Sequence, residues 1–514
     1  MKRFVLFTVM LHFLLCLSAQ QEVYFNKRID LSDGYDKGLS LLEVNNKYVI
    51  GTITDDSTYH YFWQLAFVTI DSAGNKLNTK VYGDTISHHM LGNPGALIDY
   101  ENNKYYAVGN IISPGGDWVF NRGWMLCLDN NFDTLWTRTY GETTEPYDTT
   151  FVIFQIKKTF NRNLITTGVR LPKLTPSSLW LMETDSMGNK LWETFIGGED
   201  EYYYQGHSVV QTDDGGYAIG GFKFKIGSIS RGDPLIIKTD SLGNEQWRIN
   251  PGNPDVDDNK VMLTTDSDGN IVAGTNYGTQ ESGDHQWMVV KILKVTPEGE
   301  IIWDNDYTES GYDKFLLNTT ILDNGNIVTN GSVRNFGDNE PRRTSWILSV
   351  DSSGNQLWYR EYNLLIGTNS FNYLSDVRQT YDNGLIGCGV VMPGLPYDTG
   401  TVDIWVMKMD SVGCIEAGCD TIVGLAEINK KHKSGFRVFP NPASNELTIA
   451  LEEDSSHNSD VKIVNIYGIT TKEITIPAGS KMERIDITSW KPGVYFATFN
   501  NGKKVTSVKF IIKR

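Results

Sequence analysis

The chain contains 514 residues, of which 40% are hydrophobic, 12% aromatic and 21% charged, and its formal net charge is −16. This acidic balance argues against a nucleic-acid-binding surface, which would be basic, and against adhesion to anionic membranes. The length exceeds the usual range of one compact domain, so we expect several domains or a large repeat architecture.

The first 19 residues predict a secretory signal peptide. Lys2 and Arg3 provide the positive n-region, and residues 4–17 form an apolar stretch that is too short to span a bilayer. Small residues precede Gln20, so we expect cleavage between Ala19 and Gln20. No second long apolar stretch follows, so we expect no membrane span in the mature protein.

A pattern with a spacing of 55 to 59 residues recurs throughout residues 20–420. Each copy consists of an apolar strand, a turn rich in Gly and Asn, and a strand that usually carries Trp. The turns begin at Asp71, Asp129, Asp185, Asp240, Thr296, Asp351 and Asp410. Between these turns a second pattern recurs, in which a polar turn precedes an apolar run that ends at Gly, as hairpins do.

Each repeat unit therefore contains four strands. In the fourth unit we expect these strands at 208–212, 217–222, 235–239 and 245–249. Such units, without long helical periodicity, predict an all-β fold in which residues 20–420 form a seven-bladed β-propeller. The alternative is a superhelical β-solenoid, for which this period is long.

The last repeat unit lacks its fourth strand, because no Trp strand follows Asp410. A segment that resembles a fourth strand stands instead near the N-terminus, from Val23 to Asp30. We therefore expect the N-terminal strand to complete the last blade, which would leave no open sheet edge.

The repeated turn has a sufficient structural explanation. Asp accepts backbone N–H groups, Gly or Asn takes the left-handed conformation, and Trp packs between blades. The Trp residues at this position are Trp136, Trp192, Trp247, Trp303 and Trp358, and Asn78 replaces Trp in the first unit. The turn is similar to motifs of quinoprotein propellers and to sialidase Asp boxes, but its spacing matches neither, so we expect no cofactor.

No catalytic or metal-binding set can be assembled from the sequence. Residues 266–270 are similar to the start of a calcium loop, but Tyr277 stands where the bidentate Glu of such a loop is needed. No Ser-His-Asp or Cys-His arrangement and no Gly-rich phosphate loop can be placed. We therefore expect no catalytic residues, no metal and no cofactor.

Four cysteines remain once Cys16 leaves with the signal peptide. Cys414 and Cys419 lie close together after the last predicted blade strand, so a disulfide between them is expected in an oxidising compartment. Cys127 and Cys388 fall in predicted strands of blades that are not neighbours, and we expect both to be buried free thiols.

The composition changes after residue 420. Residues 421–436 are short, mixed and rich in Lys, which is typical of a linker, and residues 437–514 alternate apolar and polar residues like the strands of a small β-sandwich. The motif residues of this segment include Pro440, Asn441, Pro442, Gly468, Gly493 and Tyr495. In order and spacing, residues 437–514 resemble the C-terminal (type A) sorting domain of type IX secretion cargo, an Ig-like sandwich.

This resemblance implies export through the periplasm to the outer cell surface or the medium. It also implies that the type IX machinery and its sorting protease are partners. The domain would then be removed, with release of the protein or its attachment to surface lipopolysaccharide.

For the propeller we expect a binding or structural role with a glycan or protein ligand, and no nucleic-acid partner. The loops between second and third strands, and those between units, should lie on one side of the ring and form the ligand face. Their aromatic residues include Trp118 and Tyr203, the latter within the run of residues 202–204. The alternative is a secreted glycan-active hydrolase or lyase, which would need two carboxylates within catalytic reach.

Overall fold

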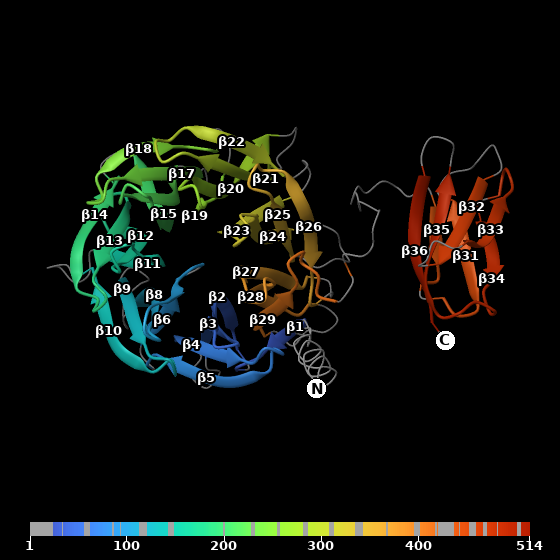
Figure 1. Ribbon diagram of the computed structural model, residues 1–514, viewed down its shortest axis with the longest axis horizontal. Coiled ribbons are helices and arrows are strands. Elements are labelled where there is room, and N and C mark those ends of the chain that lie inside the picture. The colour runs from blue at the N-terminus through green and yellow to red at the C-terminus, as the bar shows by residue number, and fades with distance from the viewer. Residues whose placement is uncertain are drawn as a thin grey trace, which may run out of the picture. The chain divides into compact units, whose positions relative to one another are not determined.

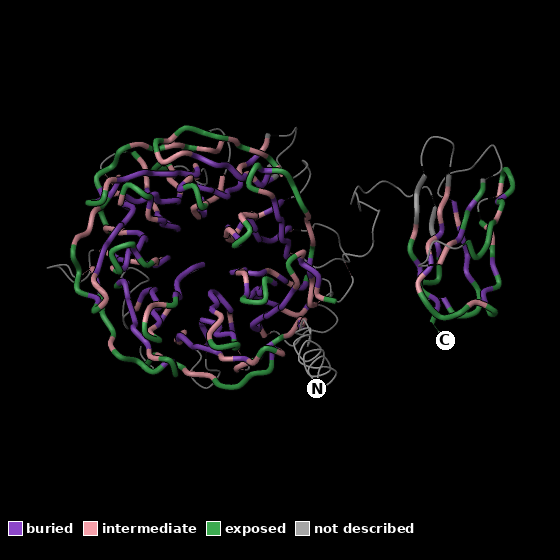
Figure 2. The backbone as a smooth tube through the Cα atoms, viewed as in Figure 1, coloured by how far each residue is buried: buried purple, intermediate pink, exposed green. Residues whose placement is uncertain are grey.

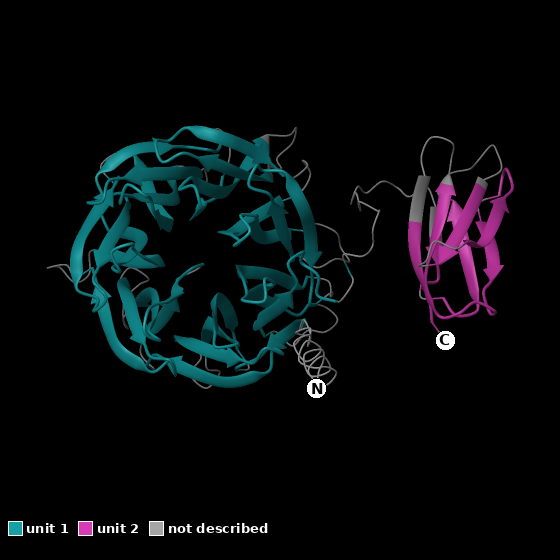
Figure 3. Ribbon diagram, in the orientation of Figure 1, with its two compact units in different colours: residues 1–420 teal, residues 421–514 magenta. Residues whose placement is uncertain are grey.

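The computed structural model divides the chain into two compact units, residues 1–420 and 421–514 (Figure 3). It describes residues 24–513 apart from 33, 56–61, 85–86, 93, 113–120, 142–148, 199–200, 228–231, 254–257, 281–285, 308–312, 335–342, 366–368, 395–400, 417–418, 420–435, 442, 452–458, 466–469, 481 and 501–504. The regular structure within these described residues is entirely β-strand, as the sequence predicts.

In the first unit, antiparallel sheets follow one another around a ring (Figure 1). The first contains β2 (Asp36–Val44), β3 (Lys47–Asp55), β4 (Trp63–Ile70) and β5 (Lys76–Tyr82). In the second, β6 (His88–Leu91) and β7 (Leu97–Asp99) both pair with β8 (Tyr105–Ile112), which is followed by β9 (Asn121–Leu128) and β10 (Thr134–Tyr140). The third contains β11 (Thr149–Lys158), β12 (Leu164–Pro172), β13 (Ser178–Thr184) and β14 (Lys190–Ile196).

The ring continues with two further sheets of four strands. These are β15 (Tyr202–Gln211), β16 (Tyr217–Lys225), β17 (Gly232–Thr239) and β18 (Glu245–Ile249), then β19 (Met262–Thr265), β20 (Ile271–Gln280), β21 (Gln286–Val295) and β22 (Ile301–Asp306). An eight-stranded sheet completes the ring. It contains β23 (Asp313–Ile321), β24 (Ile327–Arg334), β25 (Arg343–Val350), β26 (Gln356–Tyr362), β27 (Phe371–Gln379), β28 (Leu385–Met392), β29 (Asp403–Met409) and β1 (Phe25–Ile29).

The N-terminal strand pairs with the last strand of the ring, as predicted. β1 lies antiparallel to β29, with Phe25 opposite Lys408 and Ile29 opposite Ile404. Asn26 fixes this register further, because its Oδ1 accepts a hydrogen bond from the Trp405 indole at 2.6 Å. The edge of β29 is therefore covered by a segment from the other end of the unit.

Burial follows the position of each strand in its sheet (Figure 2). The third strands are mostly apolar and mostly buried, and every residue of β13 is buried, because neighbouring sheets pack against these strands from both sides. The outermost strands, such as β10, are mostly exposed. Cys127 lies on β9 and Cys388 on β28, and both are free and buried, as predicted.

The strands of the fourth sheet contain the segments predicted from the sequence, but three of them are longer. β15 begins at Tyr202, β16 extends to Lys225 and β17 begins at Gly232. The strands are extended because residues 202–206 pair with residues 221–225, and residues 221–224 also pair with residues 232–235 of β17. The prediction placed the residues of this extension in loops.

The second unit consists of two sheets around one core. The first contains β30 (Phe436–Phe439), β31 (Glu446–Leu451) and β34 (Met482–Asp486). The second contains β33 (Thr470–Ile476), β32 (Ser459–Asn465), β35 (Gly493–Asn500) and β36 (Val505–Ile512). Leu447 and Ile449 on one sheet and Ile463, Ala497 and Phe510 on the other are buried in this core.

Candidate functional site

The inner strands of the ring share a local irregularity. A β-bulge interrupts the register after Gly38, Ile153, Gly206, Leu316 and Leu374. The residue that resumes pairing after each bulge is polar: Ser40, Gln155, Ser208, Asn318 and Asp376. Because a bulge leaves ladder groups unpaired, these side chains stand where hydrogen-bonding groups are needed.

Several of these polar side chains connect neighbouring sheets. The Gln155 Oε1 atom accepts a hydrogen bond from the Val209 N–H at 2.8 Å, and the Ser208 Oγ atom accepts one from the Leu263 N–H at 3.0 Å. Asp376 accepts the Leu41 N–H at 3.2 Å where the last sheet meets the first. These buried groups are therefore used in holding the ring together.

Three half-buried cations lie on or directly before inner strands of the ring. Arg378 on β27 is held by Asp376, with Nε and Oδ2 3.0 Å apart, and it also reaches the Leu97 carbonyl oxygen at 3.4 Å. Burial and the positive charge of Arg378 lower the pKa of Lys157 on β11, Asp376 opposes the shift, and the resulting pKa is about 8. Since β11 and β27 belong to sheets that are not neighbours, these charges meet across the ring.

The third cation, Lys260, precedes β19, and burial lowers its pKa to about 8 as well. Its charge acts on the neighbouring His207, whose pKa burial and Lys260 together hold well below the usual value. In a protein of net charge −16, Lys157, Arg378 and Lys260 are thus cations near the inner strands, with Asp376 among them.

An aromatic row extends from the inner strands along the fourth sheet. Tyr203 lies opposite Phe224 across β15 and β16, with ring centroids 4.8 Å apart, and Phe224 lies 5.8 Å from Phe222. Phe222 in turn lies 5.4 Å from His207, which stacks at 4.4 Å on Phe154 of the neighbouring sheet. We call these five residues the aromatic row, and all but His207 are half-buried.

His207 is the buried polar member of the aromatic row. It is 9% exposed, and neither ring nitrogen has a hydrogen-bond partner among the described residues. Its lowered pKa leaves the imidazole neutral at neutral pH, with one N–H donor and one acceptor available. Buried polar groups normally have partners, so this unsatisfied imidazole marks a position where a ligand group or water would bond.

The structure places the predicted ligand residue Tyr203 in this row but corrects its surroundings. Residues 202–204 belong to β15 and not to a loop. Because side chains alternate along a strand, Tyr204 is buried in a core cluster on the opposite face from Tyr203. Trp118, the other predicted ligand residue, and Ala19 and Gln20 of the predicted cleavage site lie outside the described residues.

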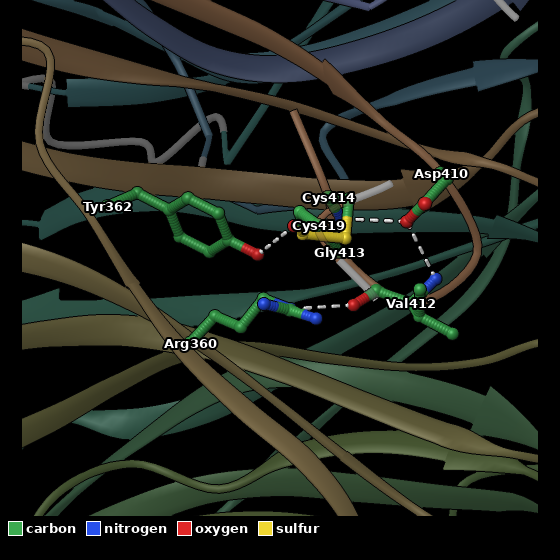
Figure 4. Close-up of a disulfide and its surroundings, with 7 residues drawn as sticks. All are labelled: Arg360, Tyr362, Asp410, Val412, Gly413, Cys414 and Cys419. Carbon is green, nitrogen blue, oxygen red and sulfur yellow. Dashed lines mark hydrogen bonds between the residues drawn. A yellow bond between two sulfur atoms is a disulfide. The ribbon is translucent and has the colours of Figure 1, made fainter. Parts of the chain in front are cut away.

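The disulfide between Cys414 and Cys419 is present, as predicted, directly after β29 (Figure 4). The turn before it is held by Asp410, whose Oδ1 accepts the N–H groups of Val412 and Cys414 at 2.9 and 2.7 Å. The Tyr362 hydroxyl donates to the Gly413 carbonyl oxygen at 2.7 Å. The disulfide therefore fixes the chain where it leaves the ring.

The motif residues of the second unit support its fold. Asn441 bonds to β36 twice, through the Ile511 N–H at 2.9 Å and the Lys509 carbonyl oxygen at 3.2 Å. Tyr495 is buried beside Phe510, with centroids 5.7 Å apart. Pro440 follows β30 through a cis peptide bond, and Gly493 begins β35 with a positive φ of 154°. Pro442 and Gly468 lie outside the described residues.

This two-sheet unit with its separated motifs defines the class: an exported protein that carries its sorting signal as a folded C-terminal domain. Residues 437–513 match the family model described as secretion system C-terminal sorting domain. The protein is therefore a cargo of the type IX secretion system, exported to the cell surface or secreted. Among the described residues, no helix is long and apolar enough to cross a membrane.

No curated protein matches this sequence. Several solved structures are similar at low identity. A polysaccharide lyase, the PL25 ulvan lyase bound to -[GlcA(1-4)Rha3S]-, is 8% identical with a TM-score of 0.47, over 76% of this chain and 97% of its own. The α-L-arabinofuranosidase Arb93A from Fusarium graminearum is 10% identical with a TM-score of 0.38, over 75% and 98%. A fungal alcohol oxidase of the AA5 family, in complex with copper, is 11% identical with a TM-score of 0.43, over 96% and 100%.

Proposed function

We propose that the first unit is a seven-bladed β-propeller. The eight-stranded sheet supports this, because one residue pair, Arg343 with Phe371, joins β25 to β27 within it. Divided at that pair, it gives one blade of β23–β26 and one of β27–β29 with β1, which match the four-stranded sheets elsewhere in the ring. The second unit is then an Ig-like sandwich.

We further propose the following domain organisation: a signal peptide at 1–19, the propeller at 20–420, a linker at 421–436 and the sorting domain at 437–514. The division into units at residue 420 and the sorting-domain match at 437–513 both support it. The type IX machinery delivers the propeller, and its sorting protease removes the second unit.

The propeller's proposed role is to bind an anionic ligand at the aromatic row, with acidic glycans as the class to test first. The observation that carries this proposal is the aromatic row itself, in which half-buried rings stand beside an unsatisfied buried imidazole. Rings that stand side by side on a sheet present their edges outward, and ring edges carry partial positive charge. Together with Lys260, they favour carboxylate or sulfate groups over neutral ones.

Binding is preferred to catalysis because the one close group of acids found among the described residues is too buried to flank a glycan bond. That group consists of Asp30, Asp36 and Asp403. Asp36 and Asp403 are fully buried, so a glycan chain would not reach either of them. Glycoside hydrolysis needs two carboxyl groups that flank the bond to be broken.

The test is a glycan array with the secreted protein, comparing acidic glycans with their neutral counterparts. Replacing Tyr203 or Phe224 with Ala should reduce binding of the recognised glycan at least fivefold, since truncating an aromatic contact residue costs about 1 kcal/mol or more. Tyr381→Ala is the matched control, because Tyr381 is 75% exposed on the short turn after β27. Equal loss in all three variants, or binding to no acidic glycan, would contradict the proposal.

A further inference from the structure

Three carboxylates meet where the ring closes. A carboxylate oxygen from each of Asp30, Asp36 and Asp403 lies within 4.8 Å of the other two. Asp30 follows β1, Asp36 begins β2 and Asp403 begins β29, so each comes from a different segment. β1 pairs with β29, and Tyr35 bridges Val402 beside them. We call these three residues the closure cluster.

The closure cluster is held rigidly. The Asp36 Oδ2 atom accepts the Leu31 N–H at 2.7 Å and the Ser32 N–H at 3.2 Å, and its Oδ1 accepts the Thr54 hydroxyl at 2.5 Å. The Asp403 Oδ2 atom is paired with the Arg28 guanidinium at 2.6 Å. The oxygens are therefore preorganised before any ligand arrives.

Negative charge in the cluster is not balanced by the described residues. Asp36 and Asp403 are both 0% exposed, and Arg28 is the described cation that pairs with the cluster. Three carboxylates beside one guanidinium leave an excess of two negative charges, which burial makes costly.

A second observation points to a missing ligand. The Oδ1 atom of Asp403 is buried and has no hydrogen-bond partner among the described residues, although Oδ2 of the same carboxylate is fully used. A buried carboxylate oxygen without a partner is rare in folded proteins, and a bound ion or water is a standard explanation. The Oδ1 atom is therefore free to coordinate a cation while Oδ2 keeps its bond to Arg28.

We propose that the closure cluster binds one calcium ion. The cluster provides carboxylate oxygens as ligands and contains no His or Cys. A set of oxygen ligands suits a hard cation. Calcium accepts six to eight oxygens in irregular geometry, so three carboxylates can bind it with water completing the shell, whereas magnesium requires near-octahedral ligands. The bound ion ties β1 to β2 and β29, and so locks the strand that closes the ring. This site is independent of the proposed glycan binding.

The experiment is isothermal titration of calcium chloride into the secreted protein after treatment with EDTA. We expect one ion per chain with a dissociation constant of about 0.1–1 mM, the usual range of extracellular calcium modules. Asp403→Asn should abolish the binding, and Asp30→Asn should weaken it at least tenfold. Asp304→Asn is the control, because Asp304 is half-exposed on the outer strand β22 and pairs with Lys291.

Asp30 is exposed, so Asp30→Asn should fold even if the buried Asp403→Asn variant does not, and it then tests the proposal alone. For the wild type and the Asp304 variant, saturating calcium should also raise the unfolding temperature and slow proteolytic cleavage near residues 24–31. No calcium binding at 5 mM, tighter binding of magnesium, or unchanged binding in Asp30→Asn would each overturn the proposal.

Discussion

One contact recurs at most interfaces between neighbouring sheets: an aromatic ring on the outer strand of one sheet lies against the turn glycine of the next. A Cβ atom placed on Gly243 would lie 2.9 Å from the Trp192 ring, and one on Gly74 would lie 2.8 Å from the Phe25 ring. The same contact joins Trp136 to Gly188, Trp247 to Gly299, Trp303 to Gly354 and Trp358 to Gly413. The glycine is needed both for its positive φ and for the space above it.

One interface lacks this contact between an aromatic ring and glycine, and an aromatic residue on the turn replaces it. At the first interface Asn78 replaces the Trp, and the next turn has Phe132 in place of glycine, with a positive φ of 59°. The Phe132 ring stacks on Tyr105 with centroids 4.7 Å apart, and it lies 5.4 Å from Phe67. The sequence predicts that the Trp residues pack between blades. It does not predict this replacement, because the two positions meet only when the sheets pack.

The first prediction compares two glycines with the same φ of 82°, Gly243 and Gly215. A Cβ atom on Gly215 would meet nothing within 4 Å, so Gly215→Ala should cost only about 1–2 kcal/mol for the left-handed backbone. Gly243→Ala adds collisions with Thr194 and Trp192 of the preceding sheet and should cost about 2–5 kcal/mol. The free energy of unfolding from denaturant titration measures both, and equal costs would show that the indole contact does not hold the sheets together.

The second prediction concerns pH. Lys157 and Lys260, with pKa values of about 8, are charged below that pH and lose their charge above it. Affinity for an anionic ligand should therefore be constant below about pH 7 and fall by roughly threefold or more above pH 8. Lys260→Arg should move part of this loss to higher pH, because guanidinium remains charged. Affinity that is independent of pH up to 10 would show that these lysines do not contribute to ligand binding.

At the scale of strands, the repeat predicts most of the architecture because every unit must satisfy the same hairpins. The fourth sheet shows the limit of this reasoning. The extended parts of β15 and β16 contain Gly206 and Gly221 and a bulge, which the pattern of alternation does not reveal. The register across this bulge is what brings Tyr203 to Phe224 and His207 to Phe222. The sequence therefore points to Tyr203 and misses the other members of the aromatic row.

The third prediction tests the closing strand. Deleting residues 20–31 removes β1 and exposes the edge of β29, whose residues 403–409 are fully buried and apolar at most positions. An uncovered apolar edge pairs with other chains, so the truncated protein should aggregate or form higher oligomers in light scattering. Deleting only residues 20–23, which leaves β1 intact, is the control. A monomeric and equally stable 20–31 deletion would mean that β1 does not seal the ring.

At the scale of the whole molecule, the C-terminal domain is the part of the function that the sequence predicts best. Its motifs are local, as Asn441 and Tyr495 show, and each supports a contact within the same small sandwich. The closure cluster is the opposite case. Asp30 and Asp403 lie at opposite ends of the first unit, and their approach depends on closure of the entire ring. Sequence analysis therefore predicted no metal, whereas the folded chain offers a candidate site.

The measurement that tests the account most directly is the fate of the C-terminal domain in the native host. Mass spectrometry of surface and culture fractions should find peptides of the first unit without those of residues 437–513. A chain that ends before residue 437 should accumulate in the periplasm instead. Extracellular protein that retains the peptide near Arg514, together with normal export of the shortened chain, would contradict the view that this domain is a removable sorting signal.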